Sequence, residues 1–128
     1  MRCAKFGTTR MTKSTTSFEP GDVVLVRFPF TDLSDFKQRP VVVLSPNEYW
    51  SLHRDLIVMP ITSQQQVDAQ LALNDWAASG LLKPSWVKPL LASVTERAVS
   101  RALGRLSSSD ATSIRHALRL MIDAQWLS

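Results

Sequence analysis

The sequence predicts a small, mainly β domain: a barrel of short antiparallel strands with one helix at its C-terminal end. Short segments rich in β-branched and other apolar residues follow one another closely, with Pro, Gly and Ser turn signals between them. No connection between them is long enough for a helical crossover, so a parallel sheet is not expected. A chain of 128 residues predicts one domain, which can build a core without disulfides.

Five segments are predicted to be strands because apolar residues run together or alternate in them. In chain order they are Val23–Phe28, Pro40–Leu44, Leu56–Met59, Val67–Leu73 and Trp86–Val94. Proline has no N–H to donate, so Pro89 is expected to interrupt the last strand or to place it at an edge or a bulge. Between the strands we expect a polar loop at Thr31–Gln38, a short helical turn at Asn47–His53 and a connection at Asn74–Pro84.

A single amphipathic helix is predicted near the C-terminal end. Its apolar residues follow the spacing i, i+3, i+4, i+7, i+8 of one helical face: Ile114, Ala117, Leu118, Met121 and Ile122. Ser107, followed three residues later by Asp110, resembles a capping box, with Asp in place of the usual Glu or Gln. We expect the apolar face of this helix to pack on the barrel.

The positive charge lies almost entirely at the start of the chain. Four of the 15 lysines and arginines fall within residues 1–17, which contain no acid, and the remaining 11 match the 11 acidic residues of the body. Residues 1–17 are predicted to be a basic, disordered leader, and residues 18–128 the folded domain, because the leader has little apolar surface. A nucleic-acid surface on the body must therefore come from local clustering of cations.

The chain offers few candidates for a metal or cofactor site. Cys3 is the single cysteine, and His53 and His116 are far apart, so nothing has zinc-ligand spacing. No Gly-rich phosphate loop is present, and no apolar run approaches the length of a signal peptide or membrane span. We expect a cytoplasmic protein without a metal or cofactor.

Three stretches stand out as candidate chemistry. Arg39 precedes a core strand, where a guanidinium fork could hold phosphate oxygens, although most loop arginines are simply solvated. Thr62 and its neighbours Ser63 and Gln64 follow a strand and could bind phosphates or bases, or could form an ST turn. The tryptophans could stack on bases, but core or interface packing is the favoured interpretation for all four.

Together and in this order, these stretches resemble the MazF/PemK family of bacterial toxin ribonucleases, in particular its PemK-like branch. The resemblance covers residues 20–122 and rests on GDVVLVRFPFTD, QRPVVVLSP, DLIVMPITSQ, NDWAASGLLKPSWVKP and LGRLSSSD. It implies an SH3-like β-barrel and a homodimer with a shared RNA groove that a cognate antitoxin protein blocks. It also implies a type II toxin–antitoxin toxin that inhibits growth as an endoribonuclease, cutting single-stranded RNA by attack of the 2′-hydroxyl on the adjacent phosphate.

The resemblance places the family's catalytic arginine on Arg39 and its catalytic threonine on Thr62. A permanent guanidinium suits the charge that develops on an attacked phosphate, and a hydroxyl can fix the phosphate for in-line attack; neither role needs a metal. The residues expected to contact RNA are Lys37, Gln38, Ser63, Gln64 and Lys88.

One stretch departs from the family pattern. Several members carry an Arg-Thr-hydrophobic-Asp pattern near the fifth strand, whereas this chain has Ser93 at the arginine position and Glu96 as a candidate acid or base. Lys88 is the cation expected to compensate for the missing arginine.

Two alternatives belong to other classes: a CcdB-like toxin that binds gyrase, and an inactive nucleic-acid-binding relative. A gyrase-binding toxin needs neither Arg39 nor Thr62, although Trp126 near the C-terminal end weakly favours it. For the homodimer, we expect Trp50, Trp76 and part of the C-terminal helix to be exposed and to lie between the subunits.

Overall fold

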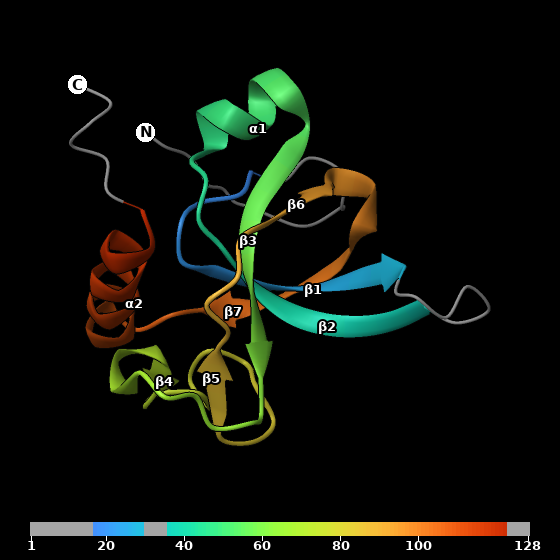
Figure 1. Ribbon diagram of the computed structural model, residues 1–128. Coiled ribbons are helices and arrows are strands. Elements are labelled where there is room, and N and C mark those ends of the chain that lie inside the picture. Colours follow the sequence, from blue (N-terminus) through green and yellow to red (C-terminus); the bar gives the residue numbers. More distant parts are fainter. Residues whose placement is uncertain (1–16, 30–35, 123–128) are drawn as a thin grey trace.

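The computed structural model describes residues 17–29 and 36–122 (Figure 1). Its strands are β1 (Asp22–Pro29), β2 (Phe36–Val43), β3 (Asp55–Thr62), β4 (Ala72–Leu73), β5 (Ser85–Val87), β6 (Ala92–Thr95) and β7 (Val99–Arg105). Its helices are α1 (Asn47–His53) and α2 (Ser108–Met121), with single 3₁₀ turns η2 (Ala69–Leu71) and η3 (Glu96–Ala98).

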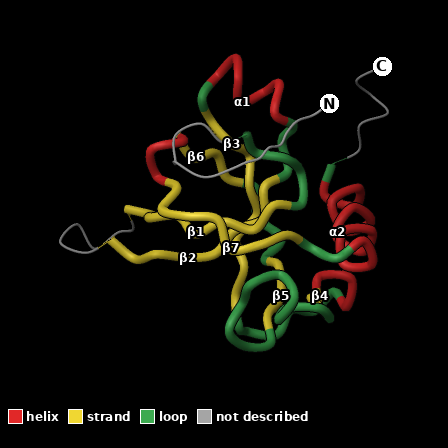
Figure 2. The backbone as a smooth tube through the Cα atoms, turned by 180° about the vertical axis from the view of Figure 1, so that it is seen from behind, coloured by secondary structure: helices red, strands yellow, loops and turns green. Residues whose placement is uncertain are grey.

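The strands form one curled antiparallel sheet in the order β4-β5-β3-β2-β1-β7, with β6 as a further partner of β3. The sheet bends into a half-barrel, and α2 lies along one side of it (Figures 1 and 2). The predicted class, a mainly β barrel with a C-terminal helix and no parallel pairing, is confirmed.

The strand β3 is the centre of the sheet. It pairs with β2 on one side, and on the other side with β6 and then β5. Between Val58–Ala92 and Ile61–Val87, two residues of β3 face the four residues 88–91. The predicted interruption at Pro89 is therefore confirmed, and it divides the segment into two strands separated by a bulge.

Two expectations about local structure were wrong. Val67–Leu73 is not a strand, because the Asp68 carboxylate accepts a hydrogen bond from the Gln70 N–H (2.8 Å) and starts the 3₁₀ turn η2, so that only β4 is extended. The loop at Thr31–Gln38 ends early: Phe36–Gln38 already pair with β1, and residues 31–35 lie outside the described residues.

The strand β7 was missed altogether. Two register shifts against β1 break its alternation, and β7 lies at a sheet edge, so its sequence lacks the usual period of two. Its last residue, Arg105, forms an ion pair with Asp22 of β1. Burial raises the pKa of the Asp22 carboxyl above its usual value, and this effect outweighs the opposing pull of Arg105.

Apolar residues form two clusters, one on each face of the sheet, because successive strand residues point to opposite faces. The first cluster lies under α2 and includes Val23, Val42, Met59, Ile61, Leu71, Leu73, Val87, Leu106, Ile114 and Ala117. The second cluster consists of Val24, Val26, Val41, Val43, Leu56, Val58 and Val94.

The helix α2 confirms the predicted amphipathic helix and is anchored through Asp110. Ser107 is the N-cap and accepts the Asp110 N–H (3.1 Å), as in a capping box. The fully buried Asp110 carboxylate accepts hydrogen bonds from the N–H groups of Asn74 (3.0 Å) and Asp75 (2.9 Å). Asp110, three residues after the N-cap, therefore fixes a turn that is distant in the sequence. Ile122 lies just past the helix and is 40% exposed.

Two glycines allow the turn at residues 74–80 to touch β7 backbone to backbone. A Cβ on Gly80, whose φ is +89°, would lie 2.1 Å from the Leu103 carbonyl oxygen. A Cβ on Gly104 would lie 2.6 Å from the Ser79 carbonyl oxygen. Neither position has room for a side chain, so these contacts depend on glycine.

One end of the second cluster is closed by aromatic and charged side chains. Phe18 packs edge-on against Trp50 (5.4 Å between ring centroids), and the Trp50 indole donates a hydrogen bond to Glu96 Oε1 (2.9 Å). The Arg54 guanidinium lies 4.5 Å from the centre of the same indole. These contacts hold α1 and η3 together over the sheet.

The expectation that Trp50 and Trp76 are exposed, and so available to lie between subunits, was wrong. Trp50 is half-buried against the second cluster, and Trp76 and Trp86 are half-buried against the first. Their apolar surface is used inside one chain, so Trp50 and Trp76 are not the exposed anchors that we expected. Trp126 lies outside the described residues.

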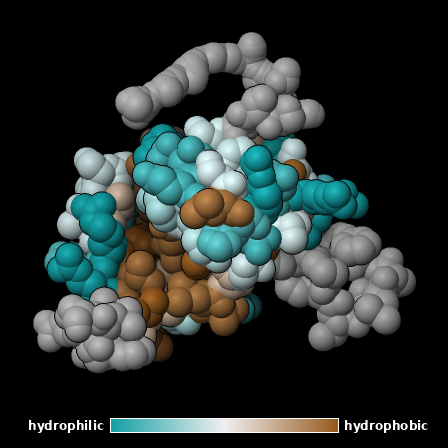
Figure 3. All heavy atoms as spheres, turned by 90° about the horizontal axis from the view of Figure 1, so that it is seen from above, coloured by the Kyte–Doolittle hydropathy of each residue, from teal (hydrophilic) through white to brown (hydrophobic). Residues whose placement is uncertain are grey.

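Exposed apolar side chains occur near the end of α2, where Leu120 is 82% exposed and lines the same cavity as the exposed Val67. Leu90 and Leu91 are exposed as well. Seen from above, an apolar area lies beside α2 among hydrophilic side chains (Figure 3).

Candidate active site

The candidate site lies where the sheet divides into two ladders. β2 and β3 pair only between Val41–Val43 and Val58–Pro60. Beyond the Val41–Pro60 pair, β2 stays with β1 while β3 continues with β5. Arg39 and Thr62 are each two residues beyond that pair, so alternation turns both side chains toward the same face of the sheet. Arg39 and Thr62 thus lie on the two diverging strands, and we call the place where these strands separate the opening between the ladders.

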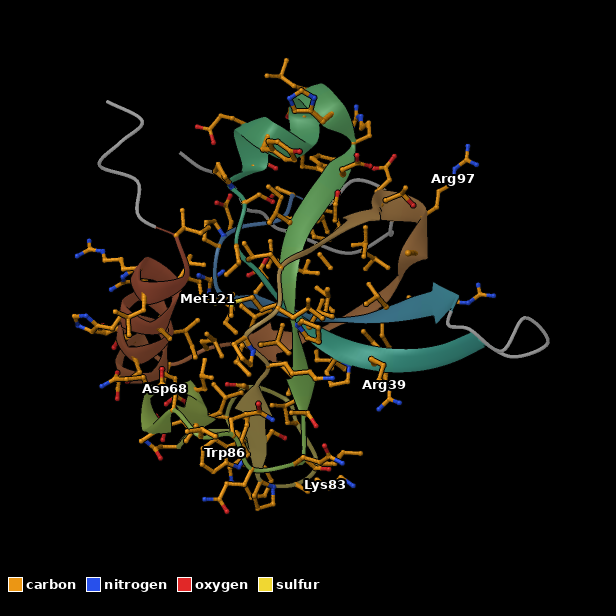
Figure 4. All side chains as sticks on the ribbon, in the orientation of Figure 1. Arg39, Asp68, Lys83, Trp86, Arg97 and Met121 are labelled. Atoms are coloured by element: carbon orange, nitrogen blue, oxygen red, sulfur yellow. The ribbon has the colours of Figure 1, made fainter. Side chains whose placement is uncertain are left out.

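Arg39 is an exposed side chain on a fixed backbone. It pairs in register with Val26, which is fully buried in the second cluster, so the core determines the position of its Cα. In Figure 4 its side chain projects from β2 in the direction in which β3 runs. The backbone of Arg39 is thus fixed, and its exposed guanidinium extends along the direction of β3.

Thr62 is half-buried at the end of β3, opposite Trp86 of β5. Its hydroxyl oxygen accepts a hydrogen bond from the Gln64 N–H (3.1 Å), so the ST turn considered as an alternative is present. This bond occupies one lone pair and leaves the hydroxyl proton able to donate. The local turn therefore orients the hydroxyl and leaves its donor function available.

The residues expected to contact RNA fall on different sides of the site. Ser63 and Gln64 are exposed in the turn that follows β3. Lys88 is exposed, and its N–H donates to the Pro60 carbonyl (2.8 Å), which places it on the far side of β3 from β2.

The two candidates before Arg39 on β2 are less closely tied to the site. Gln38 pairs with Arg27, and alternation turns it to the face opposite that of Arg39. Lys37 belongs to β2, and its side chain lies outside the described part of the structure.

Within one chain, Glu96 does not join Arg39 and Thr62. Thr95 pairs with Asp55, so Glu96 follows the end of β3 opposite to Thr62. Its carboxylate accepts the Trp50 indole N–H and lies 3.9 Å from the Arg54 guanidinium. Ser93 is also near that end, opposite Ile57.

Sequence reasoning did not single out Gln66. Its side-chain amide donates to the Gln64 carbonyl (3.0 Å) and so supports the turn that orients Thr62. The polar run at residues 63–66 was the one available signal, and it does not distinguish Gln66 from its neighbours.

Within residues 17–29 and 36–122, no group of three or more His, Cys, Asp and Glu side chains could hold a metal ion. No helix in the same ranges has both the length and the apolar composition needed to cross a membrane.

Solved structures with this fold include toxins and endoribonucleases. A MazE–MazF structure from Deinococcus radiodurans superposes with a TM-score of 0.66 at 20% identity, over 83% of this chain and 96% of that one. The Mycobacterium tuberculosis toxin MazF-mt6 gives 0.63 at 23% identity, over 80% and 96%. An endoribonuclease from a mycobacterial species gives 0.66 at 16% identity, over 89% and 99%.

At these identities the structural similarity establishes the fold. A comparison with curated proteins found no match. The family model described as "PemK-like, MazF-like toxin of type II toxin-antitoxin system" matches residues 19–122, which include β1 to α2 and the whole candidate site. This chain therefore belongs to the PemK-like, MazF-like toxin family of type II toxin–antitoxin systems.

Proposed function

We propose that this toxin is an endoribonuclease that cleaves single-stranded RNA at the opening between Arg39 and Thr62. The observation that carries the proposal is the placement of these two side chains on one face, just beyond the last β2–β3 pair. Mycobacterial and Deinococcus proteins of the same fold are described as an endoribonuclease and as MazF toxins, which supports the reaction class.

In the proposed reaction, the 2′-hydroxyl of one nucleotide attacks the phosphorus of the next linkage. The 2′-hydroxyl gives up its proton to solvent as its oxygen bonds phosphorus. The bond from phosphorus to the 5′-oxygen then breaks and that oxygen takes up a proton from solvent, which leaves a 2′,3′-cyclic phosphate and a 5′-hydroxyl. The five-coordinate intermediate carries more negative charge than the starting diester. A guanidinium can hold two phosphate oxygens at once, so Arg39 stabilises the charge as it develops.

Thr62 has a positioning task at the same phosphate. With its oxygen accepting from Gln64, the hydroxyl proton can bond a non-bridging phosphate oxygen and keep the attacking and leaving oxygens in line. Exposed neighbours extend the RNA contact along the turn and across β3: Ser63, Gln64 and Lys88, with Lys37 and Gln38 contributing from β2. Neither Arg39 nor Thr62 requires a metal ion for these roles.

The toxin is proposed to act in the cytoplasm as a homodimer. The body of the chain has balanced charge, so one copy attracts RNA weakly, whereas two copies of Arg39 and Lys88 on a shared face would concentrate positive charge. An antitoxin is proposed as the second partner, because structures of this fold include MazE–MazF and an endoribonuclease with its cognate antitoxin. An acidic antitoxin segment would compete with RNA for the same cations.

Cleavage of a short single-stranded RNA in excess EDTA tests the proposal. Arg39→Ala and Thr62→Val should each lower the rate by about 100-fold or more, the effect of losing one charge-stabilising donor. Arg39→Lys should also be poor, because an ammonium cannot make the bidentate contact. Both side chains lie at the rim of the core, so the melting temperature should stay near that of the wild type.

Arg119→Ala is the matched control, because Arg119 is an exposed arginine on α2, away from the opening. A fully active Arg39→Ala protein would contradict the proposal. Absence of RNA cleavage together with trapping of gyrase on supercoiled DNA would favour the gyrase-binding alternative. RNA binding without cleavage would favour an inactive relative.

A further inference from the structure

A chain of two hydrogen bonds connects Gln66 to the hydroxyl of Thr62. The Gln66 side-chain amide donates to the Gln64 carbonyl (3.0 Å), and the Gln64 N–H donates to Thr62 Oγ1 (3.1 Å). We propose that Gln66 is a positioning residue for Thr62: it holds the turn at residues 63–66 in the conformation that orients the hydroxyl. This inference rests on the proposed role of Thr62 in RNA cleavage.

Gln66 is less exposed than the other residues of the turn. Ser63, Gln64 and Gln65 are exposed, whereas Gln66 is half-buried. It lines a cavity of about 260 Å³ between the segment before η2, Pro89 and the end of α2, together with Val67, Asp68, Leu71, Ala117, Leu120 and Met121. Figure 4 labels Asp68 and Met121, which come from the two walls of this cavity. The Gln66 side chain thus borders this cavity, while its amide bonds the backbone of the exposed turn.

The consequence for Thr62 follows from hydrogen-bond geometry. A hydroxyl rotates freely unless a partner occupies one of its lone pairs, and Gln64 is that partner. The Gln64 N–H points at Thr62 only while the turn keeps its shape. Among the described residues, the Gln66 amide is the half-buried side chain other than Thr62 that bonds the backbone of this turn. Without it, the turn samples other conformations, and Thr62 is correctly oriented for a smaller fraction of the time.

Such a loss should lower kcat more than it raises KM, because Thr62 acts at the reacting phosphate, whereas Ser63 and Gln64 are two RNA contacts among several. Gln66→Leu keeps an apolar stem in the cavity and removes the donor. We expect its kcat to fall by roughly threefold to tenfold, the range for one hydrogen bond. Gln66→Lys restores a donor of similar reach and should recover most of the wild-type kcat.

Gln65→Leu is the matched control. Gln65 is the neighbouring glutamine, is exposed, and makes no side-chain hydrogen bond to the described residues. Its kcat should equal that of the wild type. The inference is overturned if Gln66→Leu has wild-type kcat, if Gln65→Leu loses as much, or if Gln66→Leu raises KM alone, which would mean direct contact with RNA.

A second measurement separates this inference from the proposed function. The Gln64 amide should exchange its hydrogen faster, and its NMR resonance should shift, in Gln66→Leu but not in Gln65→Leu. This readout does not depend on RNA cleavage. Faster exchange in a protein that does not cut RNA would leave the positioning role intact and contradict only the function, whereas unchanged exchange would overturn the positioning role itself.

Discussion

The two apolar clusters are closed in different ways. Helix α2 and the turn at residues 74–80 cover the first cluster, held by a buried carboxylate and by backbone contacts at Gly80 and Gly104. The second cluster is closed at one end by Phe18, Trp50 and Glu96, and its other end leads to the division of the ladders. Where a cluster is closed, polar and charged side chains bond other parts of the fold. Where the second cluster is open, such side chains face solvent.

The largest loss of stability is expected at Gly80, where the closure of the first cluster relies on glycine. Gly80→Ala places a Cβ 2.1 Å from the Leu103 carbonyl oxygen, on a residue whose φ of +89° disfavours any side chain. Strain and displacement of the turn together should cost about 3 kcal/mol or more. Denaturant unfolding would measure this loss. A Gly80→Ala protein as stable as the wild type would mean that the turn is not a fixed part of the closure.

The next effect concerns the buried carboxylate that joins α2 to this turn. Asp110→Ala removes an acceptor from two backbone N–H groups and should lower the free energy of unfolding by about 2–3 kcal/mol. Asp110→Asn keeps one acceptor and should lose less. The nearby exposed Ser109→Ala is a control within the same helix turn. Equal losses for Asp110→Asn and Asp110→Ala would contradict the acceptor role.

A smaller effect is expected at the closed end of the second cluster. Glu96→Ala removes the acceptor of the Trp50 indole and should lower stability by about 1 kcal/mol, the usual contribution of such a bond. Glu96→Gln keeps an acceptor and should be nearly as stable as the wild type. Both variants should cleave RNA at close to the normal rate. If Glu96→Gln is stable but inactive, Glu96 is an acid or base after all.

The smallest effect is expected from removing the leader. Phe18 packs on Trp50, so the closure of the second cluster begins at this residue. A chain that starts at Ser17 should keep the melting temperature of the full chain, while Phe18→Ala should lose about 1 kcal/mol of stability. Without its four cations, the shortened chain should bind RNA less tightly at low salt. A lower melting temperature after truncation would show that the leader packs on the domain.

Local patterns were enough to predict the strands that pair on both sides and the amphipathic helix. They failed for β7, whose bulges disturb alternation, and for Val67–Leu73, where the side chain of Asp68 starts a 3₁₀ turn. In each case a contact specific to the structure overrides a weak periodic signal.

The candidate site was also predictable from the sequence only in part. Resemblance to a family identified Arg39 and Thr62, and the register of two strands then puts them on one face. Sequence spacing could not show that Glu96 follows the opposite end of β3, because that depends on which strand pairs with which. It also could not separate Gln66 from the two glutamines before it, because only the half-buried one bonds the turn.

The order of strands along the chain also bears on how the protein folds. Val43 of β2 pairs with Val58 of β3 across one short helix, whereas Val26 of β1 pairs with Val99 of β7 near the far end of the described chain. Closing a long loop costs more entropy than closing a short one, and distant pairings slow folding. The strands that carry Arg39 and Thr62 can therefore associate early, and the docking of β7 is the slow step of folding. Substitutions in β7 should slow refolding more than substitutions at the opening between the ladders.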